Sequence, residues 1–161
     1  MTTGTGTFTQ HATFTIERDY PAPPARLFRA WAEPEAKARW FACHDDWRSE
    51  GHQLDFRAGG SERLDTYPSA GDPSGDNVHA YRAHYYDVVP DERIVYAYEM
   101  YLGDKRMSVS LATVLFEPRA GGTRMTFTEQ LVMFDDRWDA AGRELGTREG
   151  LENLARELAR A

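Results

Sequence analysis

Four stretches of alternating apolar and polar residues, joined by short turns, constrain the fold of this chain more than any other feature. They are His79 to Val89, Arg93 to Leu102, Arg106 to Glu117 and Thr123 to Phe134. Alternation with a period of two is typical of half-buried strands, and strands joined by turns of three to five residues lie antiparallel to one another. The sequence therefore predicts an antiparallel meander with one apolar face, which another layer must cover.

The last segment of the chain, Trp138 to Ala161, predicts the helix that covers this face. Its apolar residues recur at helical spacing among Arg and Glu residues, and they are Leu151, Leu154, Ala155 and Leu158. A long helix packed on an antiparallel sheet is an α+β arrangement.

A row of glycines precedes these apolar residues in the same segment. Gly142, Gly146 and Gly150 fall four residues apart and therefore lie on one helix face. Each glycine in a helix costs about 1 kcal/mol relative to alanine, so this strip without side chains indicates space for another molecule. The alternative is a helix that begins only near Thr147, with Gly142 and Gly146 in a loop.

The first half of the chain predicts one strand, two short helices and two further strands. Thr13 to Tyr20 alternates as a strand does, and the prolines at 21, 23 and 24 end it and begin a helix that stops before Pro34. A second short helix is expected from Pro34 to Phe41, with proline again at its first position. The sheet of about six or seven strands is completed by Gln53 to Ala58 and Glu62 to Tyr67, followed by a loop at 68–77.

Composition and charge limit the classes of partner. With 161 residues, 41% of them hydrophobic, the chain is expected to form one domain over residues 1–161, with a loose leader at 1–11. The net charge of −7, with 19 scattered Lys and Arg residues, argues against a nucleic-acid partner. The sequence has no signal peptide, no membrane-spanning run and a single cysteine, Cys43, so we expect a cytoplasmic protein without a membrane partner.

Several segments together resemble the heat-shock protein 90 ATPase activator-like family, which belongs to the START-like (SRPBCC, birch-pollen-allergen-like) superfamily. The resemblance spans roughly residues 12–160 and is carried by Phe14 to Arg18, Ala22 to Trp31, Pro34-Glu35, Trp40-Phe41, Asp55 to Gly60, Pro90 to Val95, Ser108 to Thr113 and Gly122 to Gln130. It implies a helix-grip fold, in which a curved antiparallel sheet wraps around the C-terminal helix and often leaves an apolar cavity. Many members carry Gly-Trp near the start of that helix, whereas here Thr147 follows Gly146.

Glu129 is the main candidate for chemistry. It alternates with Met125, Phe127, Leu131 and Met133 on the more apolar face of its strand, which is the face expected to point inward. A buried carboxylate needs a partner; without one its pKa would rise, and it could act as a general acid or base or orient a polar group of a ligand. The alternative is an edge position, where the carboxylate reaches water or an arginine.

Other candidates would line a pocket for a small apolar or aromatic molecule. Tyr96 and Tyr98 share a strand face and offer apolar surface with a hydroxyl, although structural packing explains most tyrosines. Ser110 could add a hydroxyl, but no Gly-x-Ser-x-Gly motif surrounds it. In the resembled fold, Trp40 and Phe41 would border the cavity entrance. The predicted ligand-binding set is Trp40, Phe41, Tyr96, Tyr98, Ser110, Phe127, Glu129, Gly142, Gly146 and Gly150.

Neither a metal nor another cofactor is predicted. Cys43-His44-Asp45-Asp46 has suitable residue types, but adjacent side chains do not usually converge on one ion, and no second Cys/His pair follows at ligand spacing. Asp72 and Asp76 lack the ligand series of a calcium loop.

Three functional hypotheses follow. The first is a binding protein for a small, largely apolar ligand held between sheet and C-terminal helix. The second is a cyclase- or hydrolase-type enzyme that uses Glu129 with a tyrosine or serine hydroxyl as acid and base. The third, implied by the family name, is a partner-binding or chaperone-modulating protein. Val95, Tyr101, Val109 and Leu111 also make the second face of the middle strands fairly apolar, which favours a homodimer.

Overall fold

The computed structural model describes residues 8–41, 47–68 and 78–160, and its core is one seven-stranded antiparallel sheet. The strands are β1 (Gln10–Tyr20), β2 (Arg48–Leu54), β3 (Ser61–Tyr67), β4 (His79–Val89), β5 (Arg93–Leu102), β6 (Lys105–Arg119) and β7 (Gly122–Met133). Their order across the sheet is β1-β7-β6-β5-β4-β3-β2, so the first and last strands of the chain are neighbours. The helix-grip α+β fold is confirmed by this sheet together with the helices on it.

One face of the sheet is apolar and turned inward. On β7, Met125, Phe127, Leu131 and Met133 are buried, as the period of two predicts. On β5 the inward face carries Ile94, Tyr96 and Tyr98. The sequence left the orientation of β5 open, because both of its faces are apolar, and only packing against the helices decides it.

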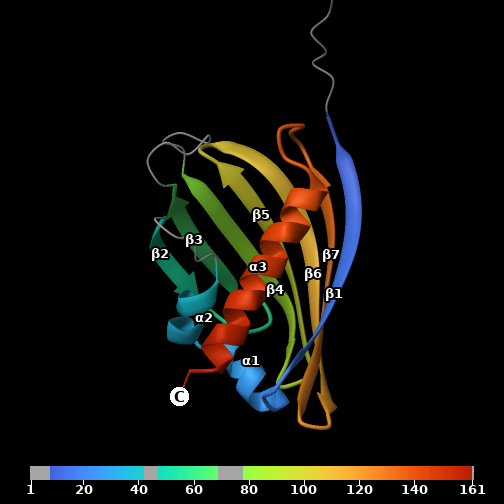
Figure 1. Ribbon diagram of the computed structural model, residues 1–161. Coiled ribbons are helices and arrows are strands. Elements are labelled where there is room, and N and C mark those ends of the chain that lie inside the picture. Colours follow the sequence, from blue (N-terminus) through green and yellow to red (C-terminus); the bar gives the residue numbers. More distant parts are fainter. Residues whose placement is uncertain (1–7, 42–46, 69–77, 161) are drawn as a thin grey trace, which may run out of the picture.

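Two short helices follow β1 and close one end of the sheet (Figure 1). They are α1 (Pro24–Ala32) and α2 (Pro34–Trp40), and each has proline in its first turn, where no intrahelical N–H bond is lost. The indole rings of Trp31 and Trp40 lie edge to face with centroids 4.9 Å apart, and Trp40 Nε1 donates to the Ala30 carbonyl at 2.8 Å. This contact packs α2 against α1.

The long helix α3 (Ala140–Leu158) runs diagonally across the inner face of the sheet (Figure 1). The three glycines lie within this helix, so the alternative that it begins near Thr147 is wrong. Asp139 caps its first turn by accepting a hydrogen bond from the Gly142 amide at 2.8 Å. In its second half Leu151 and Leu154 are buried, and this half anchors the helix.

Two strands differ from the sequence prediction by more than two residues at one or both ends. β1 begins at Gln10, so residues 10 and 11 of the predicted leader at 1–11 belong to the sheet. The second strand is Arg48–Leu54, and residues 55–58 of the predicted Gln53 to Ala58 strand lie, with Gly59 and Gly60, in the turn into β3. In that turn the chain passes close to itself, since a Cβ on Gly60 would lie 2.0 Å from the Asp55 carbonyl oxygen. Glycine is therefore required there. The bounds of this strand were predicted wrongly because the alternation of apolar and polar residues does not show where a turn requires glycine.

The outer face of the sheet carries exposed apolar side chains. Leu111 and Leu115 on β6 are 40% and 37% exposed, and Val95 and Val109 beside them are half-buried. The homodimer stays a prediction. In the ranges that the structure describes, none of the helices combines the length and apolar composition required to cross a bilayer.

Candidate functional site

A pocket of about 270 Å³ lies between the sheet and the N-terminal half of α3. The helix contributes Gly142, Arg143, Gly146, Thr147 and Gly150 to its lining. A Cβ added at Gly146 or Gly150 would meet no heavy atom within 4 Å, so these glycines leave open space between helix and sheet. The opposite side is mainly aromatic and is made by Trp31, Trp40, Phe41, Tyr81, Tyr96, Tyr98 and Phe127.

Nine of the ten predicted ligand-binding residues line this one pocket. They are Trp40, Phe41, Tyr96, Tyr98, Phe127, Glu129, Gly142, Gly146 and Gly150. The tenth, Ser110, does not line it and instead donates a hydrogen bond to Glu129. Whether any of the ten binds a ligand stays a prediction.

Glu129 is buried at the centre of a hydrogen-bond network. Its strand β7 lies between β1 and β6, so the residue does not occupy a sheet edge. Its Oε2 accepts from the Tyr98 hydroxyl at 2.8 Å and from the Ser110 hydroxyl at 2.7 Å. Two neighbouring strands therefore supply donors to one carboxylate oxygen.

Arg143 on α3 supplies the charge that balances Glu129. Its Nη1 lies 3.1 Å from Glu129 Oε2 and 3.0 Å from the Tyr98 hydroxyl, and its Nη2 donates to the Ser108 hydroxyl at 2.6 Å. The Glu129 side chain is 0% exposed and that of Arg143 is 17% exposed. This ion pair ties the glycine-rich half of α3 to the sheet.

The protonation states within this network follow from burial and from neighbouring charge. Burial raises the pKa of the Tyr98 hydroxyl above its ordinary value, so the group stays a neutral donor at physiological pH. Burial alone would lower the pKa of Arg143, but Tyr98 and Glu129 outweigh it and raise that pKa, so the guanidinium stays charged. The site therefore holds a hydrogen-bonded ion pair with a neutral phenol beside it.

Sequence reasoning identified Glu129 but missed its partner. Arg143 directly follows the first glycine of the row, and the sequence analysis assigned it no role. The sequence did indicate that such a partner exists, because a carboxylate predicted to face inward from the sheet requires a cation, which the covering helix can supply. Tyr81 and Leu64 were also missed, since β3 and β4 offered no motif that distinguished pocket residues from core residues.

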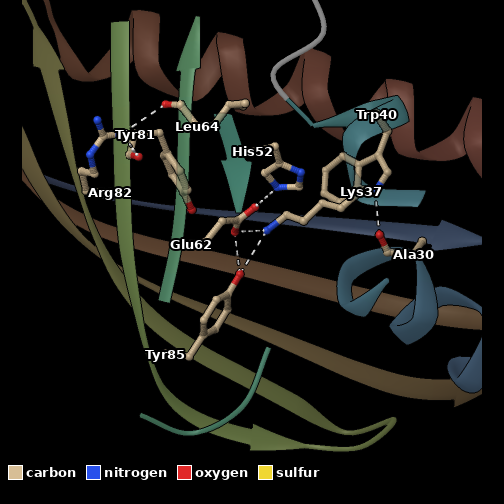
Figure 2. Close-up of polar contacts among 9 residues, drawn as sticks. All are labelled: Ala30, Lys37, Trp40, His52, Glu62, Leu64, Tyr81, Arg82 and Tyr85. Atoms are coloured by element: carbon tan, nitrogen blue, oxygen red, sulfur yellow. Dashed lines mark hydrogen bonds and ion pairs between the residues drawn. The ribbon is translucent and has the colours of Figure 1, made fainter. Parts of the chain in front are cut away.

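A second buried ion pair lies beside the pocket. Lys37 of α2 and Glu62 of β3 are both 0% exposed in their side chains, with Nζ and Oε1 2.6 Å apart. Figure 2 shows how the other partners converge on Glu62: the Tyr85 hydroxyl donates to Oε1 at 2.7 Å, and His52 Nε2 lies 2.8 Å from Oε2. The sequence analysis identified neither member of this pair.

Lys37 connects this ion pair to the aromatic side of the pocket. Its Nζ lies 4.5 Å from the centre of the Phe41 ring and 5.5 Å from that of Trp31, within the range of cation–π attraction. Phe41 and Trp31 both line the pocket. The pair thus joins α2 to strand β3, and Lys37 at the same time contacts two aromatic pocket residues.

The Glu62 carboxyl predicts a specific pH dependence of stability. Burial would raise its pKa, but Lys37, together with hydrogen bonds from His52, Lys37 and Tyr85, outweighs burial and lowers the pKa from 4.5 to about 2. A lowered folded-state pKa stabilises the fold above the unfolded value and loses this effect as the pH falls. We expect the free energy of unfolding, measured by urea denaturation, to decline from about pH 5 towards pH 2. The Glu62→Gln variant should decline less steeply, and parallel curves would contradict this assignment.

The predictions on Cys43 to Asp46, on residues 69–77 of the loop and on residues 1–7 of the leader lie outside the described residues. In the remainder, no group of three His, Cys, Asp or Glu side chains is arranged to hold a metal ion.

Comparison with known proteins agrees with this fold and sequence. The family described as activator of Hsp90 ATPase homolog 1-like protein matches residues 21–161, which is most of the chain. The chain belongs to this family. The resemblance noted from the sequence is thereby confirmed. No curated protein matches the chain significantly.

Several solved structures are similar to this chain in fold and, for two of them, in sequence. An uncharacterized protein from Rhizobium leguminosarum is 51% identical, with a TM-score of 0.86 over 96% of this chain and 98% of that chain. A protein from Rhizobium loti is 42% identical, with a TM-score of 0.82 over 93% of this chain and 99% of that chain. An AHSA1-like protein from Aeromonas hydrophila, 21% identical with a TM-score of 0.66 over 91% of this chain and 92% of that chain, shares the fold.

Proposed function

We propose that this member of the family binds a small, largely apolar molecule in the pocket between α3 and the sheet. The main support is the glycine row, because Gly146 and Gly150 lie in a helix at a cost in helix propensity and face open space. The volume of about 270 Å³ lies just below the usual range for ligand sites, so the ligand must be small. Aromatic side chains around this space would supply the apolar contacts.

Binding is favoured over catalysis by the state of the polar groups. Glu129 is held in an ion pair with Arg143, and Tyr98 is a weaker acid than free tyrosine because it is buried. The Tyr98 hydroxyl is therefore not poised near neutral pH, where general acid–base catalysis works best. The cyclase- or hydrolase-type enzyme stays the alternative. If the Glu129→Gln variant retains catalytic turnover, an enzyme that uses this carboxylate as acid or base is excluded.

The partner-binding alternative has separate support. Leu111 and Leu115 are exposed on the outer face of the sheet, away from the pocket. An interaction through this face would be compatible with a pocket that holds a ligand, so evidence for one function does not remove the other.

Filling the pocket from the helix tests the proposal. Gly146→Leu is expected to abolish binding of naphthalene, used as an apolar probe, because the new side chain would occupy the open space beside α3. Leucine favours helix more than glycine does, so the free energy of unfolding should be unchanged or higher by up to about 1 kcal/mol. Calorimetric titration measures the affinity, and urea denaturation measures the stability.

Ala141→Leu is the matched control. Ala141 is exposed on the same helix and does not line the pocket, so this variant adds the same side chain without filling the space. It should bind naphthalene as the wild type does. Equal affinity in Gly146→Leu and the wild type would place the binding site elsewhere, and absence of saturable binding to the wild type would count against the function itself.

Native mass spectrometry would identify the natural ligand. The protein purified from its own host is compared with the same sample after denaturation. A small molecule present on the wild type and on Ala141→Leu, but missing from Gly146→Leu, is the expected result.

A further inference from the structure

Three buried polar atoms around the pocket have no hydrogen-bond partner among the described residues. They are Trp31 Nε1, the Tyr81 hydroxyl and Glu129 Oε1. All three residues line the pocket, and each is at least nine-tenths buried. Buried polar groups in native proteins are nearly always hydrogen-bonded, so unpaired groups gathered around one space point to a partner that enters it.

The unpaired oxygen of Glu129 defines what this partner must offer. An ionised carboxylate oxygen can only accept hydrogen bonds, so the partner needs an N–H or O–H donor. All three donors to this carboxylate bond to Oε2, which leaves Oε1 for the incoming group. The arrangement is asymmetric: one oxygen is fixed by the protein, and the other is unpaired.

Tyr81 adds a second unpaired polar group to the residues that line the same pocket. Its ring lies 5.0 Å, centre to centre, from that of Tyr98, whose hydroxyl donates to Glu129. Burial raises the pKa of Tyr81, so its hydroxyl stays neutral and can donate to an oxygen. A hydroxyl on the partner could donate to Glu129 Oε1, and a separate oxygen of the partner could accept from Tyr81. Trp31 Nε1 could hold a further acceptor atom.

The charge balance of the pocket disfavours an ionic partner. Arg143 already neutralises Glu129, and Glu62 already neutralises Lys37 behind the aromatic side of the pocket. Glu149, which also lines the pocket, is exposed to solvent. A charged ligand would therefore lose its hydration without gaining a buried counter-ion, and this desolvation costs free energy.

We propose that the pocket binds an uncharged aromatic molecule that carries a hydroxyl group, with this hydroxyl donating to Glu129 Oε1. The aromatic part packs among Phe127, Tyr96 and the indole rings. This inference rests on the proposed function, because it specifies the ligand of the same pocket.

Four probes of one ring system test the proposal by calorimetric titration at pH 7. They are naphthalene, 2-methoxynaphthalene, 2-naphthol and the anion 2-naphthoate. A hydrogen bond to a charged group typically changes affinity by about tenfold to a hundredfold. We therefore expect 2-naphthol to bind at least about tenfold more tightly than 2-methoxynaphthalene, whose oxygen cannot donate, and more tightly than 2-naphthoate.

Two conservative variants locate the effect. In Glu129→Gln the amide oxygen can replace Oε2 and its NH₂ group replaces Oε1, so the preference for 2-naphthol over 2-methoxynaphthalene should disappear or reverse. Tyr81→Phe is the matched control, because it removes an unpaired hydroxyl from a residue of the same pocket that is not bonded to Glu129. The preference for 2-naphthol should persist in Tyr81→Phe, and its loss there would contradict the assignment to Glu129. If Glu129→Gln does not fold, the comparison of 2-naphthol with 2-methoxynaphthalene on the wild type still tests the hydroxyl requirement.

The outcomes separate this inference from the function on which it rests. If all probes bind equally and Gly146→Leu abolishes their binding, the pocket is a binding site but the hydroxyl requirement is wrong. If 2-naphthoate binds most tightly, the requirement for an uncharged ligand is wrong. If no probe binds the wild type, the proposed function fails, and this inference fails with it.

Discussion

Replacing Glu62 with glutamine is expected to lower the free energy of unfolding by about 3–5 kcal/mol. The substitution leaves the Lys37 ammonium fully buried without its counter-ion, and the pair is 2.6 Å apart in the folded protein. Removal of one partner of a buried ion pair costs more than the pair itself contributes, because the remaining charge stays desolvated. Urea denaturation at pH 7, monitored by far-ultraviolet circular dichroism, measures the change.

Two controls show whether the uncompensated charge causes this loss. Glu117→Gln breaks an ion pair with Arg119 in which both side chains are about half exposed, and it should cost less than about 0.5 kcal/mol. The double variant Lys37→Met/Glu62→Gln removes the stranded charge and should recover much of the stability lost in Glu62→Gln. If the double variant is as unstable as the sum of the two single variants, the ion pair is not the cause.

Replacing Arg143 with methionine is expected to lower the free energy of unfolding by about 2–3 kcal/mol. The expected loss is smaller than for Glu62→Gln because Tyr98 and Ser110 still donate to Glu129, and because Arg143 is 17% exposed beside the pocket. Methionine keeps much of the length of the side chain and removes its charge and donors. The loss should appear in urea denaturation, and protection of the first half of α3 against hydrogen exchange should fall with it.

The matched control combines this change with neutralisation of its partner. Arg143→Met/Glu129→Gln leaves no buried charge at the site, so it should be more stable than Arg143→Met alone. Arg148→Met on the same helix breaks an exposed i,i+4 pair with Glu144 and should change stability by less than about 0.5 kcal/mol. If Arg143→Met is as stable as Arg148→Met, the Arg143–Glu129 pair does not hold α3 on the sheet.

The two buried ion pairs have different expected effects on binding. Glu129 and Arg143 both line the pocket, so changes there should alter which ligands bind as well as stability. Lys37 and Glu62 lie behind the aromatic residues and do not line the pocket. Loss of this ion pair should change the ligand affinity only by shifting Phe41 and Trp31.

Periodicity alone determined most of the fold of this protein. Strands β4 and β5 begin and end where the alternation predicts, because half-buried strands and short turns leave local patterns in the sequence. The prolines at 24 and 34 likewise predicted where α1 and α2 begin. The glycine row predicted a space beside α3, because glycines in a helix have a local cost that needs a reason.

Only the tertiary structure decided the partners of the buried charges. Arg143 and Glu129 are 14 residues apart, and Lys37 and Glu62 are 25 residues apart, so each pair forms only where helix and sheet pack together. Alternation placed Glu129 on the inward face, but the sequence neighbours of Arg143, Lys37 and Glu62 contain no pattern that distinguishes these residues from solvated charges. A helix face or a strand face is a local property that the sequence encodes by spacing. Which residue lies opposite that face depends on how the helix is positioned on the sheet, and the spacing of residues within one element does not encode this position.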